Sequence, residues 1–123
     1  LDERYMGWAE QNVAESGGSL RISHDTDSAY AGADVVYAKS WGALPYFGNW
    51  GPEKPIRDQY QHFMVDERKM ALTNNGVFSH CLPLRRNVKA TDAVMDSPQC
   101  IAINEAENRL HVQKAIMAAL IQR

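Results

Sequence analysis

The stretch "ADVVYAKS", residues 33–40, decides the fold class of this 123-residue chain. It is a compact apolar run of the kind that a parallel strand covered on both faces shows. Similar runs follow at residues 77–81, "VFSHC", and at residues 100–103, "CIAI". Parallel strands need crossovers of about a dozen residues, which helices usually supply. The sequence therefore predicts an α/β fold, a parallel sheet flanked by helices.

Helical patterns lie between and around these runs. Residues 1–16 carry apolar side chains at close to helical spacing, and Gly17 and Gly18 supply the left-handed end that helices favour. The segment "SLRISH", residues 19–24, alternates Leu20 with Ile22 and predicts one more strand. We expect further helices from the cap Asp27 through Tyr30, from the cap Asp66 through Leu72, at residues 92–98, and from Asn104 onward with Val112, Ile116, Ala119 and Leu120 on one face.

Residues 41–55, "WGALPYFGNWGPEKP", hold three glycines, three prolines and four aromatic side chains. They show neither a helical nor a strand period, which predicts a long loop. A solvated linker would not normally carry so many aromatic side chains. We expect the loop either to pack on the domain or to cover a ligand.

Composition limits the kinds of partner. The chain is 45% apolar and carries 13 basic against 15 acidic side chains, a formal charge of −2. A chain of this length folds as one domain and buries roughly two-thirds of its unfolded surface, and its charge offers no long-range attraction for nucleic acid or an anionic membrane. No apolar stretch approaches the roughly 18 residues of a membrane span, and Leu1 opens an amphipathic segment rather than a signal peptide. We expect a cytosolic protein whose Cys81 and Cys100 are reduced.

Chemistry in such sheets is sought at the carboxyl ends of the strands, where ligands bind. Three strand exits carry polar side chains. They are residues 39–42 with Lys39, residues 80–83 with the sequence His-Cys-Leu-Pro, and residues 104–109 with Arg109. Because the carboxyl ends of parallel strands lie at one edge of a sheet, we expect all three exits to meet there.

Each exit also has an ordinary structural explanation. Lys39 can be a surface lysine that ends a strand, and His80 with Cys81 can be a core pair, since their spacing fits no metal site and lacks a third catalytic partner. Arg109 stands four residues after Glu105, which is the spacing of a helix-surface ion pair. Yet Arg109 lies in the first turns of its helix, where cations are disfavoured. An anionic or oxygen-rich ligand would compensate for that placement.

Pro83 adds a constraint on the ligand. It removes a backbone donor and stiffens the turn, which leaves the carbonyls of Cys81 and Leu82 free to accept from an N–H donor. A fitting ligand would offer an amide-like NH₂ to these carbonyls, a polarised oxygen to Arg109 and a carboxylate to Lys39. Carbamoyl phosphate together with an amino acid has this pattern.

The motifs "HCLP", "DSP" and "EAENRLHVQKA" resemble the C-terminal half of the ornithine carbamoyltransferases. Within that family, "ADVVYAKSWGALPYFGNW" and "HCLPLRRNVKATDAVMDSP" most resemble the enzymes that act on N-acetylornithine. The resemblance covers essentially the whole chain. It implies that residues 1–123 form the Rossmann-like, C-terminal acylornithine-binding domain of a carbamoyltransferase. It further implies that the δ-amine of N-acetylornithine attacks carbamoyl phosphate, giving N-acetylcitrulline and phosphate in arginine biosynthesis, without a cofactor or metal.

The resemblance also implies roles for residues at the strand exits. The main chains of Cys81 and Leu82 would bind the carbamoyl NH₂, and Arg109 would polarise the carbamoyl oxygen, which makes Arg109 and Cys81 the expected catalytic pair. Lys39 with Leu82 would contact the acylornithine.

His80 and Pro83 complete the substrate-binding set that the resemblance implies. Lys89 matches a position that the acetylornithine enzymes carry as N6-carboxylysine, although a solvent lysine in a loop is the alternative. If Lys89 is carboxylated, we expect it near Lys39 and His80.

Two departures from the family pattern matter. Ornithine enzymes usually have Ser-Met-Gly where this chain has Ser40-Trp41-Gly42, which favours an acylated acceptor. The phosphate-binding Ser-x-Arg-Thr segment of the family's N-terminal carbamoyl-phosphate domain is missing. We therefore expect these residues alone to be inactive. The resemblance implies that the full-length protein is a homotrimer. An N-succinylornithine or ornithine carbamoyltransferase, and a non-catalytic interaction module of the same fold, remain alternatives.

Overall fold

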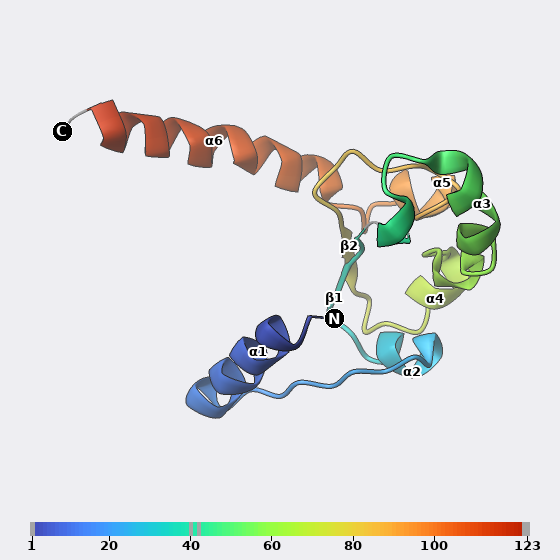
Figure 1. Cartoon of the computed structure of the whole chain (residues 1–123). Coiled ribbons are helices and arrows are strands. Elements are labelled where there is room, and N and C mark those ends of the chain that lie inside the picture. Colours follow the sequence, from blue (N-terminus) through green and yellow to red (C-terminus); the bar gives the residue numbers. More distant parts are fainter. Residues whose placement is uncertain (1, 40, 42, 122–123) are drawn as a thin grey trace.

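The structure, a computed structural model, describes residues 2–39, 41 and 43–121. Figure 1 shows the strands at the centre, short helices gathered on one side of them, and the first and last helices extending away from this body. The elements in chain order are α1 (Glu3–Ser16), α2 (Thr26–Tyr30), β1 (Val35–Tyr37), η1 (Leu44–Tyr46), α3 (Trp50–Asp58), η2 (Gln61–Phe63), α4 (Glu67–Met70), β2 (Val77–Ser79), α5 (Asp92–Met95) and α6 (Ala102–Ile121).

The strands β1 and β2 pair in parallel, which confirms the predicted sheet type. Val35 lies opposite Val77 and Tyr37 opposite Ser79. Gly76 precedes β2 at a close approach to β1, because a Cβ atom at this position would lie 2.6 Å from the carbonyl oxygen of Ala33. Only glycine fits there without moving the backbone.

The core lies where β2 meets α4 and α5. Phe78 is 0% exposed and packs in one cluster with Val65, Met70, Ala90 and Val94. Burying a side chain such as Phe78 contributes about 1.5–3 kcal/mol relative to leaving it exposed. This cluster holds β2, and with it the segment that leaves β2, in a fixed position.

The helix ends follow capping rules, with one correction to the sequence prediction. Gly17 ends α1 in the left-handed conformation, at φ 70, as predicted. The side chain of Asp66 accepts from the backbone N–H of Lys69 and so caps α4, which stops at Met70, short of the predicted end. The prediction that Asp27 caps α2 is wrong, because Asp25 is the cap that accepts from backbone N–H groups of the first turn.

The predicted strand at residues 19–24 is not formed. These residues belong to no strand, and the side chains of Leu20 and Ile22 are 45% and 60% exposed. They line a shallow cavity with α1 instead. The pattern alternates correctly, but a strand also needs a neighbour for its backbone hydrogen bonds. In the described part of the chain, no segment pairs with residues 19–24.

The prediction of a long loop at residues 41–55 is also wrong in part. This segment contains η1 and most of α3. Pro52 lies in the first turn of α3, where a missing N–H costs nothing because those donors have no partner within the helix. Glu53, also in the first turn, is buried and accepts from Arg57 at 2.7 Å. Ser40 and Gly42, at the start of this region, lie outside the described residues.

The run at residues 100–103 forms less strand than predicted. Cys100 makes a single parallel bridge with Phe78, and α6 begins at Ala102, two residues before the predicted start. The predicted apolar face of α6 is exposed, with Val112 at 58%, Ile116 at 53% and Leu120 at 65%. Within the described residues, no helix is both long and apolar enough to cross a membrane.

Candidate functional site at the edge of the sheet

The register of the two strands sets two exits side by side. Because Tyr37 pairs with Ser79, the residues two positions further on, Lys39 and Cys81, leave the same edge of the sheet. The ammonium of Lys39 donates to the Sγ atom of Cys81 at 3.2 Å. This contact lowers the pKa of the Cys81 thiol below its ordinary value. The thiolate form is thereby favoured next to a cation.

Arg109 brings the third exit to the same residue. It lies in the second turn of α6, and its Nη2 atom donates to the carbonyl oxygen of Cys81 at 2.8 Å. Lys39, Cys81 and Arg109 thus converge on one edge of the sheet, as the strand pattern predicts. One detail differs from the prediction, because the carbonyl of Cys81 is not free but accepts from the guanidinium.

His80 holds the backbone that carries this carbonyl. Its imidazole is 2% exposed, and Nδ1 accepts from the backbone N–H of Leu82 at 2.9 Å. Leu82 has the left-handed φ of 44, and the Leu82–Pro83 peptide bond is cis. Burial, followed by the charge of Lys39, lowers the pKa of His80. The ring is therefore neutral with its proton on Nε2. It contacts the backbone of Leu82 from inside the protein and does not reach the surface.

The Nε2 atom of His80 is buried and has no hydrogen-bond partner among the described residues. Such an atom is uncommon, since buried polar groups are normally paired. The imidazole is thus fixed through its Nδ1 side alone.

A carboxylate lies between the two strands and α6. Glu105 accepts from the hydroxyl of Tyr37 at 3.0 Å and from the hydroxyl of Ser79. The bond from Ser79 is the main cause that lowers the pKa of Glu105. The same carboxylate raises the pKa of Tyr37 to about 12. Glu105 is therefore ionised and Tyr37 is protonated at neutral pH.

Lys89 lies deeper, beneath Trp41. It is 6% exposed, its Nζ atom donates to the carbonyl oxygen of Trp41 at 2.5 Å, and the same atom lies 3.8 Å from the centroid of the Trp41 ring. Burial, followed by the charges of Arg57 and Arg85, lowers the pKa of Lys89. A buried lysine of this kind is not the solvent lysine of the alternative explanation.

Two cavities meet at Lys89. One, of about 490 Å³, is lined by Pro83, Arg57, Arg85 and aromatic side chains of the segment after β1. The other, of about 290 Å³, is lined by both Lys89 and Lys39. Lys39 and Lys89 therefore share a cavity, as expected, whereas His80 lies below the surface and lines neither.

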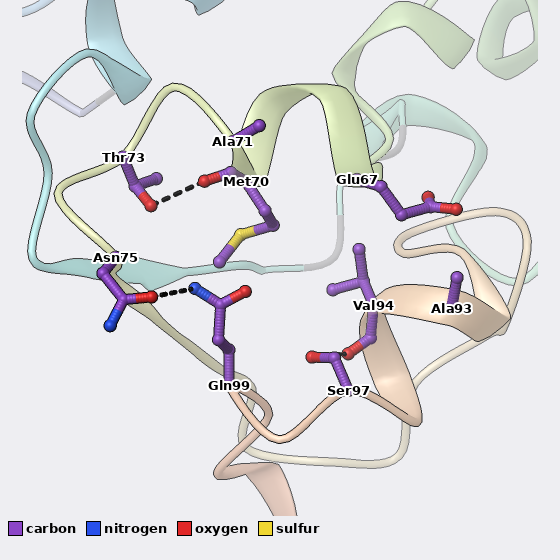
Figure 2. A pocket seen from close by; sticks show the side chains of 9 residues that line it. All are labelled: Glu67, Met70, Ala71, Thr73, Asn75, Ala93, Val94, Ser97 and Gln99. Atoms are coloured by element: carbon purple, nitrogen blue, oxygen red, sulfur yellow. Dashed lines mark hydrogen bonds between the residues drawn. The ribbon is translucent and has the colours of Figure 1, made fainter.

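Another cavity, of about 370 Å³, lies away from this site between α4, α5 and the turn before β2. Figure 2 shows its amide and hydroxyl side chains paired with one another or with the backbone, and Glu67 accepts from the hydroxyl of Thr91 at 2.7 Å. Thr73 donates to the carbonyl of Met70 at 2.6 Å, and Gln99 donates to Asn75 at 3.4 Å. None of the predicted site residues lines it. Among the described residues, moreover, no three or more His, Cys, Asp or Glu side chains are grouped to hold a metal ion.

Comparison with known proteins gives the family. A family model described as aspartate/ornithine carbamoyltransferase, Asp/Orn binding domain, matches residues 1–120. The chain belongs to this family. Curated N-acetylornithine carbamoyltransferases from Xanthomonas campestris and Xylella fastidiosa are 91% and 78% identical to it, each over 98% of the chain. The ornithine carbamoyltransferase of Pyrococcus abyssi is 40% identical over the same share. The chain spans only 36% or 37% of the length of these carbamoyltransferases.

Solved carbamoyltransferase structures share the fold. Acetylornithine transcarbamylase complexed with acetylcitrulline matches with a TM-score of 0.86 and 92% identity, over 98% of this chain and 36% of that one. An N-acetyl-L-ornithine transcarbamylase mutant complexed with carbamyl phosphate and N-succinyl-L-norvaline gives the same values. The predicted carbamoyltransferase fold is confirmed.

Sequence reasoning missed part of this candidate site. It weighed Glu105 only as an ion-pair partner of Arg109 and did not consider Tyr37 or Ser79. The signal was present, since Tyr37 and Ser79 are the last residues of β1 and β2 and so lie at the ligand-binding edge. What the pattern could not supply was the direction in which Glu105 points.

Proposed function

We propose that this chain is the acylornithine-binding part of an N-acetylornithine carbamoyltransferase. The full-length enzyme would transfer the carbamoyl group of carbamoyl phosphate to the δ-amine of N-acetylornithine, giving N-acetylcitrulline and phosphate in arginine biosynthesis. The observation that carries the proposal is the convergence of Lys39, Cys81 and Arg109 at one edge of the sheet. The identity of 91% to a relative of that name supports the acetylated acceptor.

The contact between Arg109 and Cys81 suggests how the carbamoyl group binds. Arg109 is a donor and the Cys81 carbonyl is an acceptor, and they are joined directly at 2.8 Å. A carbamoyl group has an oxygen that can accept from Arg109 and an NH₂ that can donate to the carbonyls of Cys81 and Leu82. It can therefore replace the direct bond by entering between the two residues, with both partners still satisfied.

In this arrangement Arg109 stabilises the reaction electrostatically. The δ-amine forms a bond to the carbamoyl carbon, the bond from that carbon to the phosphate oxygen breaks, and phosphate leaves with the bonding pair and takes up the proton that the amine loses. Negative charge grows on the carbamoyl oxygen while the carbon is tetrahedral, and a fixed guanidinium offsets it. Cys81 takes part through its backbone carbonyl, and its thiol stays paired with Lys39.

The acceptor would lie over the neighbouring cavities. Lys39 would contact the carboxylate of the acylornithine and Leu82 its chain, and the cavity beside Pro83 offers room for the acyl group. We propose that Lys89 is N6-carboxylated there. Its lowered pKa favours the neutral amine that attacks CO₂, and the cations Arg57 and Arg85 favour the carbamate that forms.

The test uses a full-length enzyme in which this chain is joined to the remaining two thirds of the Xanthomonas campestris relative, called the assembled enzyme below. It is supplied with carbamoyl phosphate and, in turn, N-acetylornithine, N-succinylornithine and ornithine. We expect the highest kcat/KM with N-acetylornithine and no product from the 123 residues alone. A higher kcat/KM with another acceptor would show that N-acetylornithine is not the substrate. No turnover with any acceptor would overturn the proposal as a whole.

We also propose that the full-length protein is a cytoplasmic homotrimer, with carbamoyl phosphate bound mainly by its N-terminal domain. Cys81 and Cys100 are free thiols, in line with a reducing compartment. Light scattering of the assembled enzyme would measure the trimer directly, and a monomeric mass would contradict it.

A further inference from the structure

Glu105 joins three elements of the site through one carboxylate. Its Oε1 atom accepts from Tyr37 at the end of β1, and its Oε2 atom accepts from Ser79 at the end of β2. Ser79 is 5% exposed, so this bond lies against the core. The first turn of α6 is thus fastened to the carboxyl ends of both strands.

Within the described residues, the first turn of α6 supplies the contacts that join this helix to the sheet. Ala102 is its only buried residue among those described, and Figure 1 shows the rest of the helix extending away from the body. The start of α6, where Arg109 lies one turn further on, is therefore placed by contacts in the first turn. Glu105 supplies the polar ones.

Arg109 stands one turn after Glu105, on the same face of α6. The ion pair that this spacing allows is not formed among the described residues, because both Glu105 oxygens are turned to the sheet. Arg109 instead reaches the carbonyl of Cys81. The two side chains share a helix face but have different partners, Glu105 the two strands and Arg109 the carbonyl of Cys81.

We propose that Glu105 is a positioning residue for carbamoyl transfer that acts through Arg109 by fastening α6 to β1 and β2. The proposal rests on the proposed function. In the proposed reaction, Glu105 touches neither the substrate nor the reacting atoms, and it transfers no proton. Its carboxylate only has to accept from two hydroxyls.

The test is a double-mutant cycle in the assembled enzyme, with N-acetylornithine as acceptor. Glu105→Ala should lower kcat about tenfold or more and change the KM for N-acetylornithine by less than about threefold, since a misplaced transition-state contact lowers kcat selectively. In an Arg109→Ala background, Glu105→Ala should have no further effect on kcat. Equal losses in both backgrounds would show that Glu105 acts independently of Arg109 and would overturn the proposal.

Further variants separate positioning from general loss of structure. Glu105→Gln keeps an acceptor and an amide that can bond the same two hydroxyls, so it should restore most of kcat. Tyr37→Phe with Ser79→Ala deletes only the hydroxyls and should reproduce the kcat loss of Glu105→Ala, even if the latter folds poorly. Glu107→Ala, on the same helix and in contact with His111 rather than the sheet, should leave kcat unchanged.

The outcomes distinguish this inference from the proposed function. An unsubstituted assembled enzyme without carbamoyl transfer overturns the function and the inference with it. An active enzyme in which Tyr37→Phe with Ser79→Ala has full kcat overturns the inference alone.

Discussion

The carbonyl oxygen of Cys81 accepts from Arg109 at 2.8 Å, although the two residues are 28 positions apart in the sequence. The thiol of the same cysteine accepts from Lys39. Cys81 therefore presents its backbone to one cation and its side chain to another, and each cation comes from a different strand exit. This junction is the feature on which the proposed transfer depends.

The thiol of Cys81 should be unusually reactive because of Lys39. The ammonium lowers the thiol pKa, so more thiolate is present at neutral pH than for an ordinary cysteine. Lys39→Met should move the midpoint of the pH profile for iodoacetamide alkylation upward and slow alkylation near neutral pH by roughly threefold to tenfold, since one pKa unit is a tenfold change in thiolate.

Cys100 provides the control within the same chain, since Lys39 does not contact it. Peptide mass spectrometry measures both cysteines in one sample. Identical profiles for Cys81 in the parent and in Lys39→Met would contradict the thiolate pairing.

Lys89 should take up CO₂ reversibly. ¹³C-bicarbonate should give a carbamate signal in the ¹³C NMR spectrum, and acidification should remove it, because protonation of the amine stops the reaction with CO₂. The lowered pKa of Lys89 means that the signal should persist to lower pH than for an exposed lysine. Lys89→Arg should abolish it, and Lys54→Arg, at a 66% exposed side chain, should not. A spectrum without carbamate under bicarbonate would refute the modification.

His80 should make stability depend on pH near neutrality. Its pKa in the folded chain lies below the ordinary 6.5, so the unfolded chain binds more protons once the pH falls below that value. Stability is therefore complete above pH 6.5 and is lost as the pH falls below it. The Tm should decrease between about pH 7.5 and about pH 5.5, a range in which histidine is the usual titrating group.

His80→Asn supplies a comparison without that titration. The asparagine oxygen can accept from the same Leu82 N–H, since Asn side chains often bond the backbone two residues on. Its Tm should fall less over this pH interval, whereas His80→Ala should have a lower Tm throughout. Parallel Tm curves for the parent and His80→Asn would rule out the buried neutral imidazole.

The parts of the fold that depend on strand pattern were predictable from sequence, and the parts that depend on neighbours were not. The runs at residues 33–40 and 77–81 gave the parallel pair, because continuous apolar strands occur where both faces are covered. The alternation at Leu20 and Ile22 did not become a strand, because the described chain offers it no pairing partner. Pro52 and Pro55 pointed to a loop, but Pro52 is harmless in the first turn of α3.

The candidate site, too, was predictable from sequence only in part. Lys39, Cys81 and Arg109 could be brought together in advance, since parallel strand exits share an edge of the sheet. The role of His80 could not, because a contact from Nδ1 to the N–H two residues later depends on the left-handed Leu82. The partners of Glu105 could not be predicted either, because its carboxylate could bond either the strand ends or Arg109.

The most direct test of the central claim is the steady-state kcat of Arg109→Ala in the assembled enzyme. Arg109 is exposed, so its removal should leave the Tm nearly unchanged while kcat falls by about 10²–10³, as for other losses of a preorganised donor to a developing oxyanion. Lys114→Ala, on the same helix, should retain full kcat. An Arg109→Ala enzyme with full kcat, or one altered only in its Tm, would contradict a site in which the strand exits converge to polarise the carbamoyl group.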